Sequence, residues 1–266
     1  MKIINIPIVN GLSKTKGVEE APAEILARLE SIYSNGKGNL VNVNNLEVSS
    51  IGISGDLEKD NENIYRRAFE LFGNEKLLFL GGDHSLSYPL TRAFFDYSEH
   101  NSRKPCLIVF DAHPDCMEPV DRKIPTHEEW LKALIEDGFP TKNILLVGSR
   151  NADVSELNYL KEKKIKQFTV EQLMFELETK TDAIMEFGYG KDVYVSIDID
   201  AVDPAYAPGT GYCEVGGISS QQFLYIVKRL SKMKNLKAVD LVEINPKKDV
   251  NGMTLQLGAK IVSEFL

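Results

Sequence analysis

Short apolar runs alternate with longer amphipathic segments along the whole chain. The runs LLFLGG (77–82), CLIVFD (106–111) and VYVSID (193–198) are almost continuously apolar, a pattern typical of strands covered by helices on both faces. We predict strands at residues 2–9, 40–43, 76–81, 105–111, 143–149, 164–168, 192–199 and 236–243. We predict helices at residues 21–33, 60–72, 85–98, 127–137, 154–162, 170–186, 219–232 and 253–265.

This alternation predicts an α/β fold in which helices lie on both faces of one mostly parallel, doubly wound sheet. We find no internal repeat, low-complexity tract or change in composition that would mark a linker. The eight strands are therefore expected to form a single three-layer domain spanning residues 1–266.

Composition narrows the class of protein. The chain has 266 residues, 43% hydrophobic content and a formal net charge of −8, which suits a large core and argues against nucleic-acid binding, since that requires a basic face. No apolar stretch approaches the roughly 20 residues needed to span a bilayer.

The cysteines and the N-terminal segment bear on the location of the protein. Three widely spaced cysteines form no CxxC pair, and MKIINIPIVNGL (1–12) is predicted to be a first strand rather than a signal peptide. A cytoplasmic location is expected.

Charged and imidazole side chains follow four of the predicted strands. GGDHS (81–85) and DAHPD (111–115) follow two of them, and SIDIDAVDP (196–204) begins inside a third. Glu243 follows the fourth. In parallel sheets ligands collect at the carboxyl ends of strands, so we expect these residues to meet at one edge of the sheet.

The carboxylates and imidazoles in these segments suit a metal centre. Residues two apart on an extended backbone project to the same side, as in the pairs Asp111/His113 and Asp198/Asp200. A cluster of aspartates would repel and take up protons unless cations balanced it. Four aspartates and two histidines favour two manganese ions, with zinc, iron or cobalt as alternatives. The candidate ligands are His84, Asp111, His113, Asp115, Asp198 and Asp200.

Two nearby aspartates have simpler explanations. Each aspartate taken singly could be a helix N-cap. We expect Asp83 to cap or orient the helix that follows it, and Asp203, which precedes Pro204, to form a turn or to support a ligand.

Taken together, GGDHS, DAHPD and SIDIDAVDPAYAPGTG (196–211) resemble the signature segments of the ureohydrolase superfamily of arginase, agmatinase and formimidoylglutamase. GVEEAP (17–22) and DLVEINP (240–246) also resemble family segments. The resemblance implies the arginase/deacetylase fold, an eight-stranded parallel sheet and a binuclear manganese centre. One ion would bind His84, Asp111, Asp115 and Asp198, and the other Asp111, His113, Asp198 and Asp200.

The resemblance also implies roles in hydrolysing a linear amidine. Asp115 would pass a proton to the leaving nitrogen, and Glu243 would bind the cationic amidine, although a structural pairing of Glu243 with a lysine is the alternative. His127 matches a proton-shuttle histidine, but relatives follow it with a small residue and soon a proline, whereas this chain reads HEEWL (127–131). The alternative is a histidine at the start of a helix.

Sequence signals for the substrate conflict. Cys116 and Met117 replace the family contact to an amino-acid carboxylate, and APGTG (207–211) is similar to agmatinases, which favours agmatine. SRNADVSE (149–156) instead resembles the arginase segment that meets an α-amino group, through Asp153 and Glu156, although Asp153 could equally be an exposed helix N-cap. We therefore expect an agmatinase-like enzyme, with arginase or formimidoylglutamase as alternatives. Cys116 is expected to be a small buried residue.

Other classes of protein remain open on the sequence. A deacetylase-type hydrolase would bind a single zinc, and a non-catalytic homologue would not need all six ligands. The resemblance further implies a small cationic guanidino or amidino substrate and a homo-oligomer, either a trimer or a hexamer.

Overall fold

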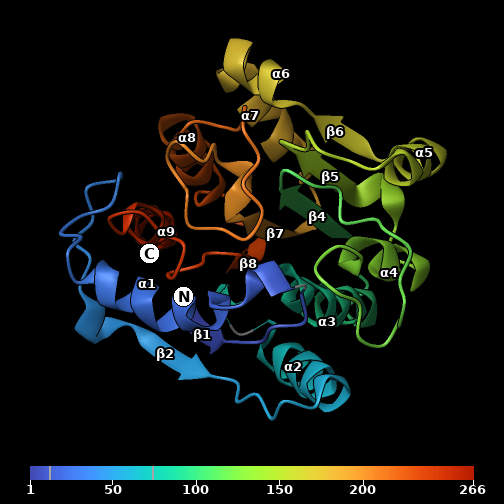
Figure 1. Ribbon diagram of the computed structural model, residues 1–266, viewed down its shortest axis with the longest axis horizontal. Coiled ribbons are helices and arrows are strands. Elements are labelled where there is room, and N and C mark those ends of the chain that lie inside the picture. The colour runs from blue at the N-terminus through green and yellow to red at the C-terminus, as the bar shows by residue number, and fades with distance from the viewer. Residues whose placement is uncertain (12, 74) are drawn as a thin grey trace.

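One parallel sheet forms the centre of the molecule (Figure 1). The computed structural model describes residues 1–11, 13–73 and 75–266. Within these residues the sheet has eight strands in the order β2-β1-β3-β8-β7-β4-β5-β6, and every pairing is parallel. The strands are β1 (Lys2–Ile6), β2 (Glu47–Ser50), β3 (Leu77–Gly81), β4 (Pro105–Phe110), β5 (Ile144–Val147), β6 (Lys166–Phe168), β7 (Asp192–Asp198) and β8 (Leu236–Val242).

Helices cover both faces of this sheet, which confirms the predicted three-layer α/β class. One face packs against α1 (Ala21–Leu29), α6 (Val170–Phe175), α7 (Leu177–Phe187), α8 (Ser220–Leu230) and α9 (Met253–Phe265). The other packs against α2 (Leu57–Leu71), α3 (Ser87–His100), α4 (Trp130–Glu136) and α5 (Val154–Glu162). Successive side chains of a strand pack alternately into the hydrophobic cores on the two faces of the sheet. Leu78 and Leu80 lie in one core, and Leu77 and Phe79 lie in the other. This explains why the central strands are apolar throughout.

Three predicted elements differ from the structure. The strand predicted at 40–43 is wrong, because Leu40 is 85% exposed and the second strand is Glu47–Ser50 at the sheet edge. The helix predicted at 170–186 is two helices, α6 and α7, separated at Glu176, whose backbone is not helical (φ −132°, ψ 41°). The helix predicted from residue 127 begins at Trp130. The remaining elements occur where predicted, apart from differences at their ends.

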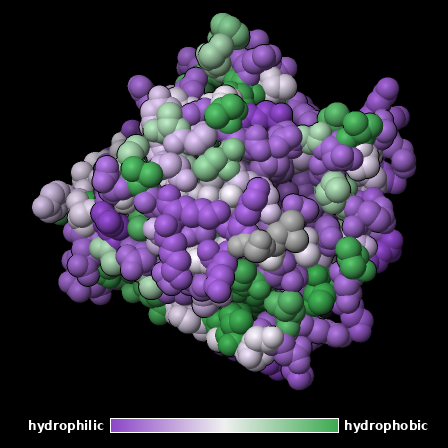
Figure 2. Space-filling model, in the orientation of Figure 1, coloured by the Kyte–Doolittle hydropathy of each residue, from purple (hydrophilic) through white to green (hydrophobic). Residues whose placement is uncertain are grey.

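The topology brings four separate loops to one edge of the sheet. β3, β8, β7 and β4 are neighbours at its centre, so their carboxyl ends open side by side. Gly82 allows the loop after β3 to pass close to the segment after β1, since a Cβ at Gly82 would lie 1.9 Å from the Ile8 carbonyl oxygen. The surface in this orientation is mostly polar, with apolar residues in several small groups (Figure 2).

Candidate metal centre and active site

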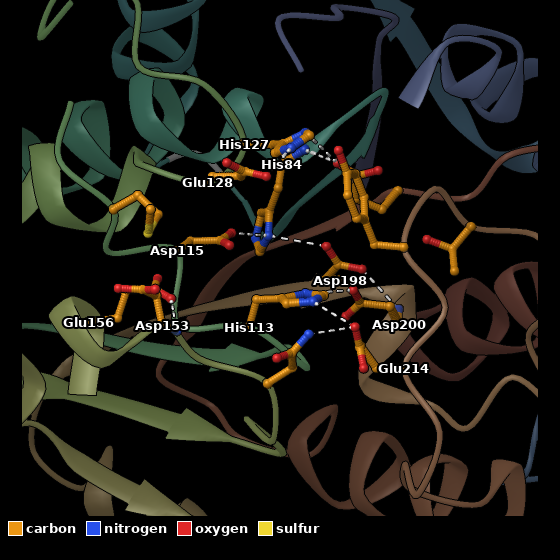
Figure 3. Close-up of a pocket in the computed structure, with 15 residues that line it drawn as sticks. His84, His113, Asp115, His127, Glu128, Asp153, Glu156, Asp198, Asp200 and Glu214 are labelled. Carbon is orange, nitrogen blue, oxygen red and sulfur yellow. Dashed lines mark hydrogen bonds and ion pairs between the residues drawn. The ribbon is translucent and has the colours of Figure 1, made fainter. Parts of the chain in front are cut away.

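A pocket of about 280 Å³ lies at the carboxyl ends of the four central strands. His84 follows β3, Asp115 follows β4, and Glu243 follows β8, while Asp198 ends β7. All four line the pocket together with His113, Asp200 and His127 (Figure 3). The topology thus brings the predicted site residues to one place.

The first group of candidate ligands surrounds His84. Its Nδ1 atom lies 3.0 Å from Asp111 Oδ2 and 2.9 Å from Asp115 Oδ2. Asp198 Oδ2 is 3.3 Å from the same nitrogen. His84, Asp111 and Asp115 are buried, and one ligand atom from each lies close enough to the others to share a metal ion.

The second group surrounds His113. Its Nδ1 atom lies 3.0 Å from Asp200 Oδ2 and 3.6 Å from Asp111 Oδ1. Asp111, His113 and Asp200 could likewise share an ion. Asp111 belongs to both groups through its two oxygens, which is the geometry of a bridging carboxylate. Asp198 is not a member of either group, because membership requires ligand atoms that all lie close to one another. It nevertheless contacts His84, and its Oδ1 accepts a hydrogen bond from the Asp200 amide at 2.8 Å.

The electrostatics of the site fit cation binding. Burial, followed by repulsion from Asp111, raises the pKa of Asp115 to about 7. Burial and the neighbouring carboxylates also raise the pKa values of Asp198 and Asp200. Burial alone would lower the pKa of His84, but the surrounding carboxylates raise it well above its usual range. These carboxylates and His84 therefore bind protons more readily than usual when no cation neutralises the charge.

His84 Nδ1 and Asp111 Oδ2 are among the buried polar atoms that have no hydrogen-bond partner of acceptable geometry within the described residues. They face each other 3.0 Å apart. Unpartnered buried polar atoms cost free energy, and a divalent cation would compensate both. Four carboxylates with two imidazoles are donors that suit manganese, so the residues present fit a binuclear centre.

A buried hydrogen-bond network supports His84 from behind. His84 Nε2 contacts Ser196 Oγ at 2.9 Å, and this hydroxyl donates to Asp240 Oδ1 at 2.7 Å. Asp240 Oδ2 also accepts from Tyr194 Oη at 2.8 Å and Ser87 Oγ at 3.0 Å. If Nε2 carries the proton and donates to Ser196, Nδ1 is left free to accept a cation. This network was not predicted from the sequence, although polar residues inside the apolar runs VYVSID (193–198) and AVDLV (238–242) were a signal for it.

Glu243 and His127 lie on one wall of the pocket. Glu243 has a positive φ of 63°, and its Oε1 accepts a hydrogen bond from the His84 amide at 3.0 Å. Burial and repulsion from Asp83 raise its pKa well above the usual range. His127 Nδ1 lies 3.7 Å from Glu243 Oε1, and burial lowers the pKa of His127. Within the described residues neither ring nitrogen of His127 has a hydrogen-bond partner.

Asp153 and Glu156 both line the pocket, and both accept hydrogen bonds from backbone amides. Asp153 is the N-cap of α5, and its Oδ1 accepts from the Ser155 amide at 2.8 Å. Glu156 Oε2 accepts from the Asp153 amide at 2.9 Å, and its Oε1 accepts from the Cys116 amide at 2.8 Å. The helix-cap explanation of Asp153 therefore describes its contacts, while its predicted role in binding substrate stays a prediction.

Three neighbouring residues behave as expected. Asp203 forms a turn, since its Oδ2 accepts from the Gly216 and Gly217 amides at 2.7 and 2.9 Å. Asp83 caps the short helix that begins at His84, with Oδ1 accepting from the Ser85 amide. Cys116 is a buried small residue, and burial raises the pKa of its thiol well above the usual range.

The outer wall of the pocket includes residues that the sequence analysis did not assign. Tyr212 places its ring centroid 5.3 Å from that of His127. Lys14 lies outside the lining, with Nζ 4.7 Å from the centroid of the Tyr212 ring. Glu214 Oε1 is 3.5 Å from His113 Nε2 and accepts a hydrogen bond from Asn151. Among the described residues that line the pocket, none is a lysine or an arginine.

Comparison with known proteins agrees with this geometry. A profile of the arginase family matches residues 1–266. Arginase 1 of Arabidopsis thaliana is 36% identical over 193 residues, 71% of this chain and 53% of that protein. Agmatinase of Bacillus subtilis is 33% identical over 190 residues, 70% of this chain and 61% of that protein. The chain thus matches about half the length of the rice and Arabidopsis arginases.

The fold is also shared with solved structures. Formimidoylglutamase from Bacillus subtilis superposes with a TM-score of 0.88, covering 99% of this chain and 85% of that one, at 23% identity. At this level of identity the likeness concerns the fold.

Proposed function

Because the chain belongs to the arginase family, we propose that it is a binuclear manganese hydrolase that cleaves a guanidino C–N bond of a linear amidine and releases urea. Family members are hydrolases acting on C–N bonds in linear amidines, and residues 1–266 would act as one catalytic domain. The observation that carries the proposal is the meeting of two three-residue ligand groups, which share Asp111, at the floor of a single pocket.

Two ions would be held by the six candidate ligands. His84, Asp111, Asp115 and Asp198 would hold one, and Asp111, His113, Asp198 and Asp200 the other. When bound, a pair of divalent ions lowers the pKa of water and so supplies a nucleophile at neutral pH.

Residues of the chain would do the remaining work. Glu243 would bind the cationic amidine by charge-assisted hydrogen bonds, since its buried Oε2 has no partner among the described residues. Asp115 would carry a proton to the leaving nitrogen, because its carboxylate lines the pocket next to His84. His127 would exchange protons between the pocket and solvent, because it lies between Glu243 and Glu128 on the pocket wall.

The charge of the pocket supports agmatine as the substrate. Agmatine carries a guanidinium group and a second amine, but no carboxylate. The pocket is lined by Glu128, Asp153, Glu156 and Glu214 beyond the metal site, and an anionic tail would meet these acids with no lysine or arginine among the described lining residues to offset them. Arginine, which has both an amine and a carboxylate, is the second candidate. Formimidoylglutamate, with two carboxylates, is disfavoured.

A substrate panel tests this proposal. The Mn²⁺-loaded protein is incubated with agmatine, arginine and formimidoylglutamate, and urea, ammonia and formamide are measured. Urea from agmatine, with the highest kcat/KM of the panel, is the expected result. Faster release of urea from arginine would show that the protein is an arginase instead. No hydrolysis of any compound would favour a non-catalytic homologue. One bound zinc per chain would favour a deacetylase-type hydrolase.

Two further properties belong to this proposal. We expect a homo-oligomer, a trimer or hexamer, which light scattering after gel filtration would measure. None of the helices in the described residues combines the length and apolar character needed to cross a membrane.

A further inference from the structure

The only tryptophan of the chain lies directly beside the proposed metal centre. Trp130 is fully buried at the first residue of α4. Its indole Nε1 donates a hydrogen bond to Asp115 Oδ2 at 2.7 Å. The ring also packs on His84, with the ring centroids 4.8 Å apart. One side chain thus contacts two candidate ligands of the same ion.

The start of α4 also holds the backbone of Asp115. The Leu131 and Lys132 amides donate to the Asp115 carbonyl oxygen at 3.2 and 3.4 Å. Asp115 has a φ of 51°, which non-glycine residues rarely adopt and which persists only when the surroundings enforce it. The helix start therefore fixes both the backbone and the carboxylate of Asp115.

We propose that Trp130 is a positioning residue whose indole N–H orients the Asp115 carboxylate toward one of the two metal positions. Asp115 belongs to the group around His84 and not to the group around His113. Trp130 donates to Oδ2, the same oxygen that lies 2.9 Å from His84 Nδ1, so the bond fixes the rotation of the carboxylate and holds this oxygen beside His84. Trp130 therefore acts on the ion at His84 and not on the ion at His113. This inference rests on the proposed binuclear centre.

A purely structural role would give a different result. Trp130 is among the largest fully buried side chains, and any change there lowers stability by loss of packing. Loss of packing on the His84 ring would weaken the same metal position in any variant that changes the shape of residue 130. The measurement must therefore resolve the two positions and must remove the N–H while keeping the shape of the ring.

The single tryptophan permits that experiment. Replacing tryptophan during expression with benzothienylalanine, in which sulfur takes the place of the indole N–H, changes residue 130 alone. Trp130→Phe is the encoded variant, and Phe139→Leu is the control, because Phe139 is a buried aromatic residue of the same core cluster. Mn²⁺ binding is followed by calorimetry, and thermal unfolding is followed in chelator.

The expected result is that one of two Mn²⁺ affinities falls about 10- to 100-fold in both Trp130 variants, as is usual when a partner of a metal ligand is removed. The second affinity stays within about threefold, and Phe139→Leu changes neither while lowering the unfolding temperature. Two unchanged affinities, or an equal loss in both, would overturn the positioning role.

A second measurement does not depend on metal. The ¹⁵N-labelled protein has one indole N–H signal, which we expect to be shifted downfield and protected from exchange with solvent, and to move in Asp115→Ala. A signal at the position of free indole that Asp115→Ala leaves unmoved would exclude the hydrogen bond. The wild-type protein could show this signal and still fail to bind Mn²⁺. That result would count against the binuclear centre, and therefore against the positioning role of the hydrogen bond between Trp130 and Asp115.

Discussion

At the scale of single residues, the centre places carboxylates where a protein core does not tolerate them. Asp111 and Asp198 are at most 4% exposed, and burying an ionised carboxylate without a compensating partner is costly. The two imidazoles supply part of the compensation, because they hold the pKa of Asp111 below its usual value despite its burial. The remaining negative charge is what two divalent ions would neutralise.

Asp198→Asn tests the ligand role directly. Asparagine keeps the shape but removes the charge, so we expect metal content to fall below one ion per chain. Turnover should fall at least about 100-fold, because metal ions supply several kcal/mol of transition-state stabilisation. Elemental analysis and a urea assay measure the two effects. Full turnover in this variant would end the proposed mechanism.

His127→Asn separates proton transfer from metal binding. We expect kcat to fall about 10²- to 10⁴-fold, the usual contribution of a general acid or base, while the protein still binds two ions. His100→Asn, at an exposed residue at the end of α3, is the control. An unchanged kcat in His127→Asn would show that His127 has only a structural role.

The candidate ligands carry a stronger sequence signal than the residues that support them. Candidate ligands such as His84 and Asp198 stand at the ends of apolar runs, and several carboxylates and imidazoles in such positions together indicate a metal centre. Trp130 was visible only as a departure from the family pattern after His127. Its partner, Asp115, is 15 positions away, and no local rule connects the two.

At the scale of elements, burial decided which strands could be predicted. The central strands are buried throughout, and their apolar runs gave their positions. β2 has an exposed pattern and pairs only with β1, so it carries no apolar signal, and the apolar residues at 40–43 were mistaken for it. The break at Glu176 lies between two amphipathic helices and likewise leaves no strong local mark.

Gly82→Ala tests the close contact between the loops after β1 and β3. The new methyl group would meet the Ile8 carbonyl oxygen, which is backbone and cannot rotate away. We expect the free energy of unfolding in chelator to fall by about 2 kcal/mol, measured with urea. Gly52→Ala is the control, since nothing lies within 4 Å of a Cβ there. Equal stability of the two variants would contradict the description of this contact.

Tyr88→Phe tests the link between α3 and α4. Tyr88 Oη donates to Asp137 at the end of α4 at 2.7 Å, so its loss should cost about 1 kcal/mol. Burial, followed by the bond to Asp137, raises the pKa of Tyr88 to about 12. The hydrogen bond of Tyr88 should therefore contribute fully to the stability of the fold below about pH 10, the pKa of tyrosine in the unfolded state. This contribution should be lost as the pH rises toward 12.

The pH dependence provides the readout for this link. Stability measured from pH 9 to 12 should decline less steeply in Tyr88→Phe than in wild type, and Tyr33→Phe, at an exposed position, should match wild type. The same slope in all three proteins would exclude the assigned role of Tyr88.

At the scale of the whole molecule, the alternation of elements predicted the layers and the number of strands but not their order. The chain inserts β8 and β7 between β3 and β4, and this places four loops from distant parts of the sequence around one pocket. The order depends on contacts between residues more than a hundred positions apart, such as Ser87 with Asp240. Periodicity contains no information on such contacts.

Metal binding should stabilise the whole fold, because the candidate ligands lie after β3 and β4 and at the end of β7, which are distant segments of the chain. Ligand at about 100 times its Kd adds about 2.7 kcal/mol for each site, so Mn²⁺ should raise the unfolding temperature and a chelator should reverse the effect. Asp198→Asn should show little response. Scanning calorimetry with and without Mn²⁺ measures this, and an unchanged unfolding temperature in wild type would count against metal binding.

The most direct measurement is anomalous diffraction from crystals grown with Mn²⁺, recorded at the manganese absorption edge. The proposed binuclear centre predicts two peaks about 3.5–4 Å apart, one among His84, Asp111 and Asp115 and the other among Asp111, His113 and Asp200, with Asp198 beside both. A single peak, or none at this edge of the sheet, would contradict it.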